Sequence, residues 1–126
     1  MHRRNLLIVT ALGEVGIGVL LLVWPPWAVQ LLLGIDQISA EVIVIGRITG
    51  AALLALGVIC WIGRSDSLGS AALGLIFGVI IYDVSAAAIL AYSGLFLHLA
   101  GLILWPAVVL HTALAIWSVK CLSVKA

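Results

Sequence analysis

Long apolar stretches separated by short connectors dominate this chain of 126 residues. A helix needs about 20 apolar residues to cross roughly 30 Å of hydrocarbon, and four stretches reach that length. The pattern predicts spans at about residues 5–23, 40–63, 68–92 and 96–119. Because the connectors Arg64–Ser67 and Ser93–Leu95 are short, consecutive spans should run in opposite directions. We therefore expect an all-α, up-down-up-down four-helix bundle, integral to a membrane, that forms one transmembrane domain over residues 1–126.

The longer connector after the first span contains a predicted short helix. Trp24-Pro25-Pro26-Trp27 precedes the mostly apolar run Ala28–Gly34. The prolines end the first span and pre-set the first turn of a new helix, which Gly34 can end. Apolar residues flanked by tryptophan favour a helix that lies in the membrane interface over a fifth span.

Composition supports an integral membrane protein and excludes one class of partner. Apolar residues make up 65% of the chain and charged residues only 9%, whereas about 25% of the residues of a soluble domain are charged. The formal net charge of +1 offers no basic surface of the kind that nucleic-acid binding requires. We therefore exclude nucleic acid as a partner.

Charge asymmetry predicts the orientation of the chain. Basic residues gather on the side of the N-terminus, and two acidic residues, Asp36 and Glu41, lie on the opposite side. The basic set is Arg3, Arg4, Arg64, Lys120 and Lys125. The positive-inside rule then places both termini in the cytoplasm.

Each predicted span contains one ionisable residue well inside it: Glu14, Arg47, Asp83 and His111. A charge near the bilayer centre costs about 2.5–3.5 kcal/mol on insertion scales, so such residues normally face a protein interior and a partner. By helical rise, Glu14 and Asp83 lie about 14 Å below the outer boundary and Arg47 about 10 Å below it. We predict a buried cluster in which Arg47 lies between the two carboxylates, one of them protonated because a single cation cannot neutralise both. Such a cluster either fixes the packing of the helices or handles a proton, an ion or a ligand.

His111 is predicted to lie deeper toward the cytoplasm, five residues after Pro106, where a missing N–H favours a kink and a small polar pocket. Two interpretations stay open. The histidine is either neutral and hydrogen-bonded to a backbone carbonyl or a hydroxyl such as Ser85 or Thr112, or it ligates a hydrophobic cofactor such as haem.

Aromatic residues mark the outer rim of the predicted bundle (Trp24, Trp27 and Tyr92) and its inner rim (Trp61 and Trp117). Tyr82 and Trp105 lie away from both rims and are predicted to be internal.

Small residues at helical spacing mark two surfaces on which helices could approach closely. The first is Gly46-x-x-x-Gly50, and the second is Ser70-x-x-x-Gly74-x-x-x-Gly78. The second surface points about 100–180° away from Asp83, so it cannot share the face of that residue. We expect it to contact another helix or another subunit.

Two resemblances add to this picture. The last three spans resemble a group of uncharacterised small four-span bacterial integral membrane proteins. The resemblance rests on Gly46-Arg47-x-x-Gly50-Ala51-Ala52, Tyr82-Asp83-x-x-Ala86-Ala87 and Trp105-Pro106-Ala107-Val108-Val109-Leu110-His111. It implies this fold and a location in the bacterial cytoplasmic membrane, and it implies no activity. A narrower likeness, four spans and Glu14 followed by Val15, is to the small multidrug resistance transporters, which exchange protons for cationic drugs; Arg47 and Asp83 lie outside that family's pattern.

The function expected from these residues is not enzymatic. No nucleophile with a base and an oxyanion site, no phosphate loop and no metal-spaced cluster is present, and we expect no cofactor or metal. We expect an accessory or structural subunit of a membrane complex, in contact with the bilayer and with other membrane subunits or copies of itself. The alternatives are an oligomeric proton-coupled small-molecule transporter that uses Glu14 or Asp83, and a binder of haem or quinone that uses His111.

Overall fold

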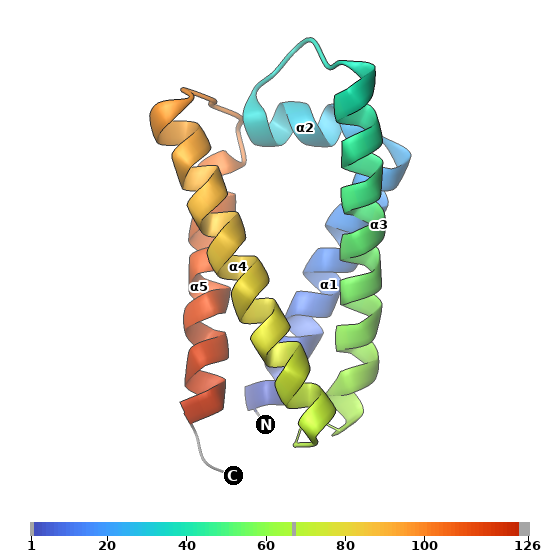
Figure 1. Cartoon of the computed structure of the whole chain (residues 1–126), viewed down its shortest axis with the longest axis vertical. Coiled ribbons are helices and arrows are strands. Elements are labelled where there is room, and N and C mark those ends of the chain that lie inside the picture. Colours follow the sequence, from blue (N-terminus) through green and yellow to red (C-terminus); the bar gives the residue numbers. More distant parts are fainter. Residues whose placement is uncertain (1, 67, 124–126) are drawn as a thin grey trace.

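The computed structural model describes residues 2–66 and 68–123, and in this part of the chain every regular element is a helix. The elements, in order, are α1 (His2–Val23), α2 (Pro25–Leu33), α3 (Ala40–Gly63), the short 3₁₀ helix η1 (Arg64–Asp66), α4 (Ser70–Phe96) and α5 (Leu104–Ser123). Among them α1, α3, α4 and α5 are long and apolar enough to cross a membrane, and they alternate in direction (Figure 1). The predicted all-α four-helix bundle is confirmed, and these four helices indicate a multi-pass membrane protein.

The predicted short helix after the first span is present, with the prolines in its first turn and Gly34 at its end. Helix α2 starts at Pro25, with proline in its first two positions, and ends at Gly34, which adopts a left-handed conformation with φ 72°. This backbone conformation suits glycine because a side chain would be strained there. The N–H of Gly34 donates to the carbonyl of Gln30 and closes the last turn.

The predicted connector Ser93–Leu95 is wrong, because these residues continue α4. The hydroxyl of Ser93 donates to the carbonyl of Ile89 at 2.8 Å, within the helix. Gly94 does not break the helix because its missing side chain lets α5 approach: a Cβ there would lie 2.9 Å from the ring of Trp105. Tertiary packing therefore outweighs the turn propensity of the local sequence.

The true connector between α4 and α5 is the apolar segment 97–103, in which His98 has a positive φ of 55°. As a result α5 starts eight residues later than predicted, and Pro106 falls in its first turn. Proline is well tolerated there because the first N–H groups of a helix have no intrahelical acceptor. The reason for expecting a kink inside the span is thereby removed.

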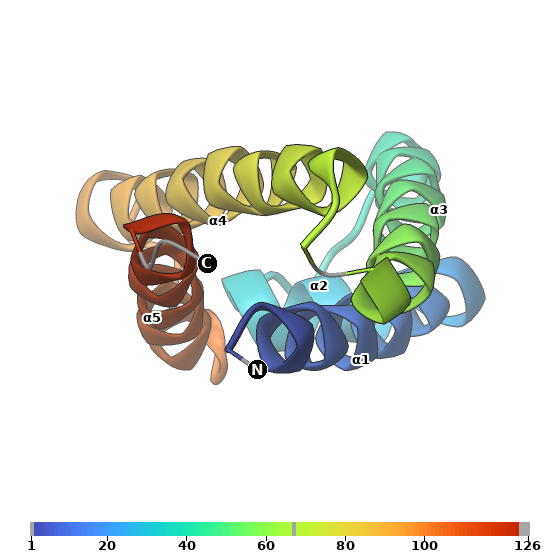
Figure 2. The ribbon, with the colours of Figure 1, turned by 90° about the horizontal axis from the view of Figure 1, so that it is seen from below.

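The long helices form two pairs, α1 with α3 and α4 with α5, and the contacts between the pairs are far fewer. Close glycine contacts join the first pair. A Cβ on Gly50 would lie 2.7 Å from the carbonyl oxygen of Gly18, and Gly57 meets the backbone of Ala11 in the same way. Gly46, one turn from Gly50, is buried against Pro25. Figure 2 shows the four long helices from the end that holds the termini, with α4 inclined to the bundle axis.

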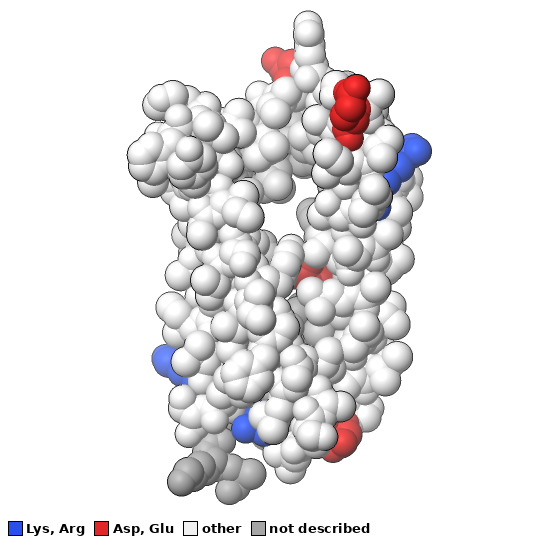
Figure 3. Space-filling view, viewed as in Figure 1, with Lys and Arg blue, Asp and Glu red and all other residues white. Residues whose placement is uncertain are grey.

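The two pairs are joined at both ends. At the end that holds the termini, Arg3 Nε donates to the carbonyl of Cys121 at 2.9 Å. An apolar core cluster comes from the N-terminal parts of α1 and α4 and the C-terminal parts of α3 and α5, and contains Leu6, Leu7, Ala11, Cys60, Ala72, Ile76, Val79, Leu114 and Cys121. At the other end α2 contacts both pairs, and the N–H of Ile103 donates to the carbonyl of Leu31. Below α2 the space-filling view shows an opening between α3 and α4, whereas the half near the termini is closed (Figure 3).

The glycine contacts give a first prediction. Gly50→Ala should destabilise the protein by about 1–3 kcal/mol, because the new Cβ meets backbone atoms of α1 that cannot move aside. Gly74→Ala is the matched control, since a Cβ there meets nothing within 4 Å. Unfolding of the detergent-purified variants, followed by circular dichroism, measures both. Equal losses of stability in the two variants would contradict the packing described.

Candidate functional site

One buried polar contact joins α4 to α5. Nδ1 of His111 and Oδ1 of Asp83 share a hydrogen bond of 2.7 Å. The side chain of Asp83 is fully buried and that of His111 is 15% exposed. Tyr82, the neighbour of Asp83 in the chain, packs edge-on against the imidazole with ring centroids 5.5 Å apart. Asp83 thus has its partner on the next helix.

Glu14 brings the other helix pair to this contact. It is buried on α1 together with Thr10, Ala11 and Gly18, which form the inward stripe of that helix. Its carboxyl lies within electrostatic range of His111 and Asp83. We call Glu14, Asp83 and His111 the polar cluster; its members come from three helices and from both helix pairs.

The hydrogen bond at the termini fixes the depth of the polar cluster. Glu14 lies eleven residues along α1 from Arg3, or about 16 Å by helical rise, and His111 lies ten residues before Cys121, or about 15 Å. Both are therefore near half of a hydrocarbon thickness of roughly 30 Å. The prediction that His111 is deeper than Glu14 is wrong, because α5 begins later than the sequence pattern indicated.

Arg47 does not join the acidic residues, so the predicted Glu14/Arg47/Asp83 cluster is corrected. Its side chain is exposed, and within residues 2–66 and 68–123 the structure gives no ion pair for it. The inward face of α3 passes through Gly46 and Gly50, together with Leu53, Gly57 and Cys60. Arg47 follows Gly46 and therefore points about 100° away from that face.

Several buried polar atoms in this region have no hydrogen-bond partner among the described residues: Thr10 Oγ1, Glu14 Oε2, Asp83 Oδ2 and Ser118 Oγ. An unsatisfied buried polar atom costs about 1–3 kcal/mol, and native proteins keep few of them. By helical rise Ser118 lies about 5 Å, and Thr10 about 10 Å, from the level of the Arg3–Cys121 contact. Polar atoms thus recur at intervals of about one helical turn between the terminal end and the polar cluster.

The hydroxyl partners proposed for His111 are not used. Thr112 donates to the carbonyl of Val108 on its own helix, at 2.7 Å, and Ser85 is exposed. The pairing of His111 with Asp83 was missed because it depends on where α5 begins. Pro106 could have indicated where α5 begins, since proline is frequent in the first turn of a helix.

The small residues predicted to lie at helix contacts occupy two different surfaces. Gly46 and Gly50 lie in the contact between α1 and α3, whereas Ser70, Gly74 and Gly78 lie on the outward face of α4. A Cβ on Gly74 or Gly78 would meet nothing within 4 Å, so nothing in the described chain covers this face. Trp105 follows the first residue of α5 and is nearly half exposed, so the expectation from the sequence that it is internal is wrong.

No family model, no curated protein and no solved structure matches this chain. The resemblance to small four-span bacterial membrane proteins therefore stays a prediction.

The geometry predicts a large loss of stability for one substitution and almost none for another. His111→Ala should destabilise the protein by about 3–5 kcal/mol, because it leaves the fully buried carboxyl of Asp83 without its partner. Arg47→Ala should change the free energy of unfolding by less than about 0.5 kcal/mol, as is usual for an exposed side chain. Denaturant unfolding in detergent micelles compares the two. A large loss for Arg47→Ala and none for His111→Ala would restore the arrangement predicted from the sequence.

Proposed function

We propose that the protein is a small proton-coupled transporter of organic cations in the bacterial cytoplasmic membrane. Glu14 and Asp83 exchange the proton in this proposal, and His111 holds Asp83 in place. The observation that carries it is the convergence of two buried carboxyl groups and one largely buried imidazole where the two helix pairs meet. Buried ionisable groups inside a membrane usually mark a path for an ion or a proton.

Charge balance supports a site that takes up a positive charge. The described chain places no lysine or arginine against Glu14 and Asp83, since Arg47 points outward. Even with a protonated His111, two ionised carboxylates leave one negative charge uncompensated. A bound proton or a cationic substrate removes that charge, and burial of an uncompensated charge is strongly unfavourable. Competition between proton and substrate for one site is the basis of coupled exchange.

The surroundings favour an organic cation with an apolar part. Between the polar cluster and α2, residues 15–23 of α1 and 104–110 of α5 are apolar. The opening below α2 lies between α3 and α4, on a lateral face of the bundle (Figure 3). A molecule that partitions into the bilayer could enter from that side and place its charge on the carboxylates.

The packing suggests how the site could change sides. Helix pair α1/α3 meets pair α4/α5 through few contacts, and the apolar core closes the terminal end. Rocking of one pair against the other around the polar cluster would open that end and close the opening below α2. Thr10 and Ser118 are suited to pass a proton along this closed half, since each hydroxyl can both donate and accept.

For orientation we propose that both termini are cytoplasmic. Both ends of the described chain lie at the same end of the bundle (Figure 1), together with Arg3, Arg4, Arg64 and Lys120, whereas Lys125 lies outside the described residues. A C-terminal fusion to a reporter that is active only in the cytoplasm should be active. A reporter active only in the periplasm would contradict the proposal if it worked at this position.

The transport proposal predicts the effect of two isosteric substitutions. Purified protein is reconstituted into liposomes that are acidic inside, with the membrane potential clamped by potassium and valinomycin, and uptake of labelled tetraphenylphosphonium is measured. The parent should accumulate the cation. Glu14→Gln or Asp83→Asn should reduce the rate by about 100-fold or more, because an amide keeps the shape and cannot release a proton.

Glu41→Gln is the matched control, since Glu41 is exposed in the first turn of α3, and its rate should equal that of the parent. Equal uptake by empty liposomes and by parent liposomes would overturn the transporter. The accessory-subunit hypothesis would then take its place, supported by the uncovered outward face of α4 with Gly74 and Gly78, to which another membrane subunit or a second copy could bind. The haem hypothesis stays open at Nε2 of His111, and the absorption spectrum of protein from its native membrane decides it.

A further inference from the structure

Arg47 is a charged residue of a membrane span that the polar cluster does not use. Among the lysine and arginine residues of the described chain, it alone lies toward the end of the bundle that holds α2, which we call the α2 end. Its side chain is exposed, and its neighbours on the surface of α3, Val44 and Ile48, are apolar and more than half exposed. A guanidinium group on such a lipid-facing surface is unusual, because charged side chains of membrane spans almost always face a protein interior.

The contact of α3 with α1 fixes the level of Arg47 in the bundle. A Cβ on Gly46 would lie 3.3 Å from Cβ of Pro25, so these two residues lie side by side. The two helices run in opposite directions. Arg47 and Trp24, each one residue nearer to the terminal end, therefore lie at about the same level.

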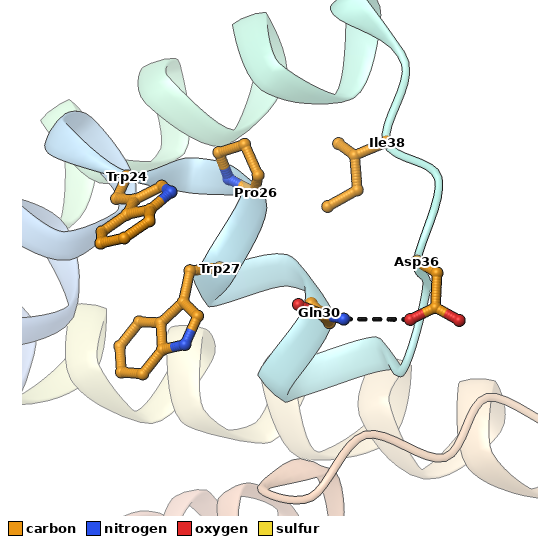
Figure 4. Close-up of a pocket in the computed structure, with 6 residues that line it drawn as sticks. All are labelled: Trp24, Pro26, Trp27, Gln30, Asp36 and Ile38. Carbon is orange, nitrogen blue, oxygen red and sulfur yellow. Dashed lines mark hydrogen bonds between the residues drawn. The ribbon is translucent and has the colours of Figure 1, made fainter.

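Trp24 marks the boundary of the hydrocarbon region. Figure 4 shows Trp24 and Trp27 next to one another where α1 passes into α2; their ring centroids lie 6.3 Å apart and both side chains are exposed. Tryptophan is enriched at the level of lipid headgroups. Trp24 follows Arg3 by twenty-one residues, or about 32 Å by helical rise, which matches a hydrocarbon thickness of roughly 30 Å. Arg47 therefore lies at this boundary, and not about 10 Å inside it as counting from the start of α3 indicated.

The acidic side chains at the α2 end do not neutralise Arg47. Nε2 of Gln30 donates to Oδ1 of Asp36 at 3.0 Å, and Figure 4 shows this bond between α2 and the connector that leads to α3. Glu41 precedes Arg47 by six residues, which places it about 120° away around α3 and about 9 Å farther along the helix. Within residues 2–66 and 68–123 neither carboxylate forms an ion pair with Arg47. The anion that balances Arg47 must therefore come from outside the described chain.

We infer that Arg47 binds the phosphate of a phospholipid, in the leaflet at the α2 end. The Cα–Cβ bonds of a helix tilt toward its N-terminus, and the N-terminus of α3 lies at the α2 end, so the long side chain extends from the boundary into the headgroup layer. The planar guanidinium can donate two parallel hydrogen bonds to the oxygens of one phosphate. Phosphate groups are the anions of this layer in a phospholipid bilayer. A lipid phosphate thus meets both the charge and the apolar surroundings of Arg47.

The contact holds one helix pair relative to that leaflet. Arg47 belongs to the pair α1/α3, whereas the part of α4 and α5 from Ser70 to Val119 contains no lysine or arginine. A bound phosphate therefore fixes the depth of α1/α3 and has no counterpart on α4/α5 at this end. The inference stands independently of the transport proposal, because it uses no residue of the polar cluster.

Solid-state NMR tests the contact directly. The protein is labelled with ¹³C at Cζ of arginine and reconstituted, in buffer free of phosphate, into bilayers of phosphatidylethanolamine and phosphatidylglycerol. Dephasing of the ¹³C signal by ³¹P reports guanidinium carbons that lie next to a lipid phosphate. The difference between the parent and Arg47→Gln isolates the signal of Arg47, which should lose most of its intensity under ³¹P dephasing. A signal that keeps its full intensity would overturn the inference.

Lipid retention gives a second measurement with a matched control. Native mass spectrometry counts the phosphatidylglycerol that stays bound to protein released from the same bilayers. Arg47→Gln should retain about threefold less than the parent, because the amide has lost the charge that strengthens the hydrogen bonds to phosphate. Thr49→Val is the control, since Thr49 is exposed two residues away and its hydroxyl donates to the carbonyl of Ile45 on its own helix. An equal loss in Thr49→Val would assign the effect to a general change of the surface and contradict the site.

A third arm distinguishes the lipid from a soluble anion that has the same chemistry. The labelled parent is reconstituted into bilayers of a galactolipid, which contains no phosphate, and inorganic phosphate is added to the buffer. The Arg47 signal should keep its intensity under ³¹P dephasing, because the guanidinium then has no phosphate within the headgroup layer. Dephasing by inorganic phosphate in galactolipid, together with none in the phospholipid bilayers, would assign the site to a free anion and overturn the lipid.

Discussion

A carboxyl group that is removed from water must find a partner, and the position of α4 against α5 follows from this need. Asp83 is fully buried and meets His111 at 2.7 Å, and Glu14 on α1 lies within electrostatic range of both side chains. The pairs α1/α3 and α4/α5 touch each other little. Their relative position therefore depends on this polar cluster, on the apolar core on its terminal side and on α2 at the other end.

In the proposed transporter one set of residues serves both helix packing and proton exchange. Close glycine contacts hold α1 against α3, whereas the surface between the pairs contains buried oxygen atoms that have no hydrogen-bond partner among the described residues. Such atoms weaken a contact that is purely structural and suit one that changes during a cycle, because a proton, a water molecule or a substrate can satisfy them in turn. The interface that holds the pairs together is thus also the one best placed to respond to protonation.

The sequence predicted much of the fold because apolar length and proline positions are local signals. The first two spans end near Val23 and begin at Ala40, where prolines and a serine cap mark the boundaries. The last two were misplaced because the connector 97–103 is as apolar as a helix. For the site, depth and charge favoured Arg47 as the partner of the acids, but neither quantity reports which way a side chain faces. The repeat Gly46, Gly50, Gly57 marks the face of α3 that meets α1, and it excludes Arg47.

The most direct test of the account is a double-mutant cycle between α1 and α5. The free energy of unfolding is measured for the parent, Glu14→Gln, His111→Ala and the double variant, beside a control cycle that pairs Glu14→Gln with Arg47→Ala. The electrostatic interaction of Glu14 with His111 should give a coupling of about 0.5–3 kcal/mol, whereas the control pair should be additive within about 0.5 kcal/mol. Additivity in the Glu14–His111 cycle, with coupling in the Arg47 cycle instead, would contradict the polar cluster as the contact that joins the two helix pairs.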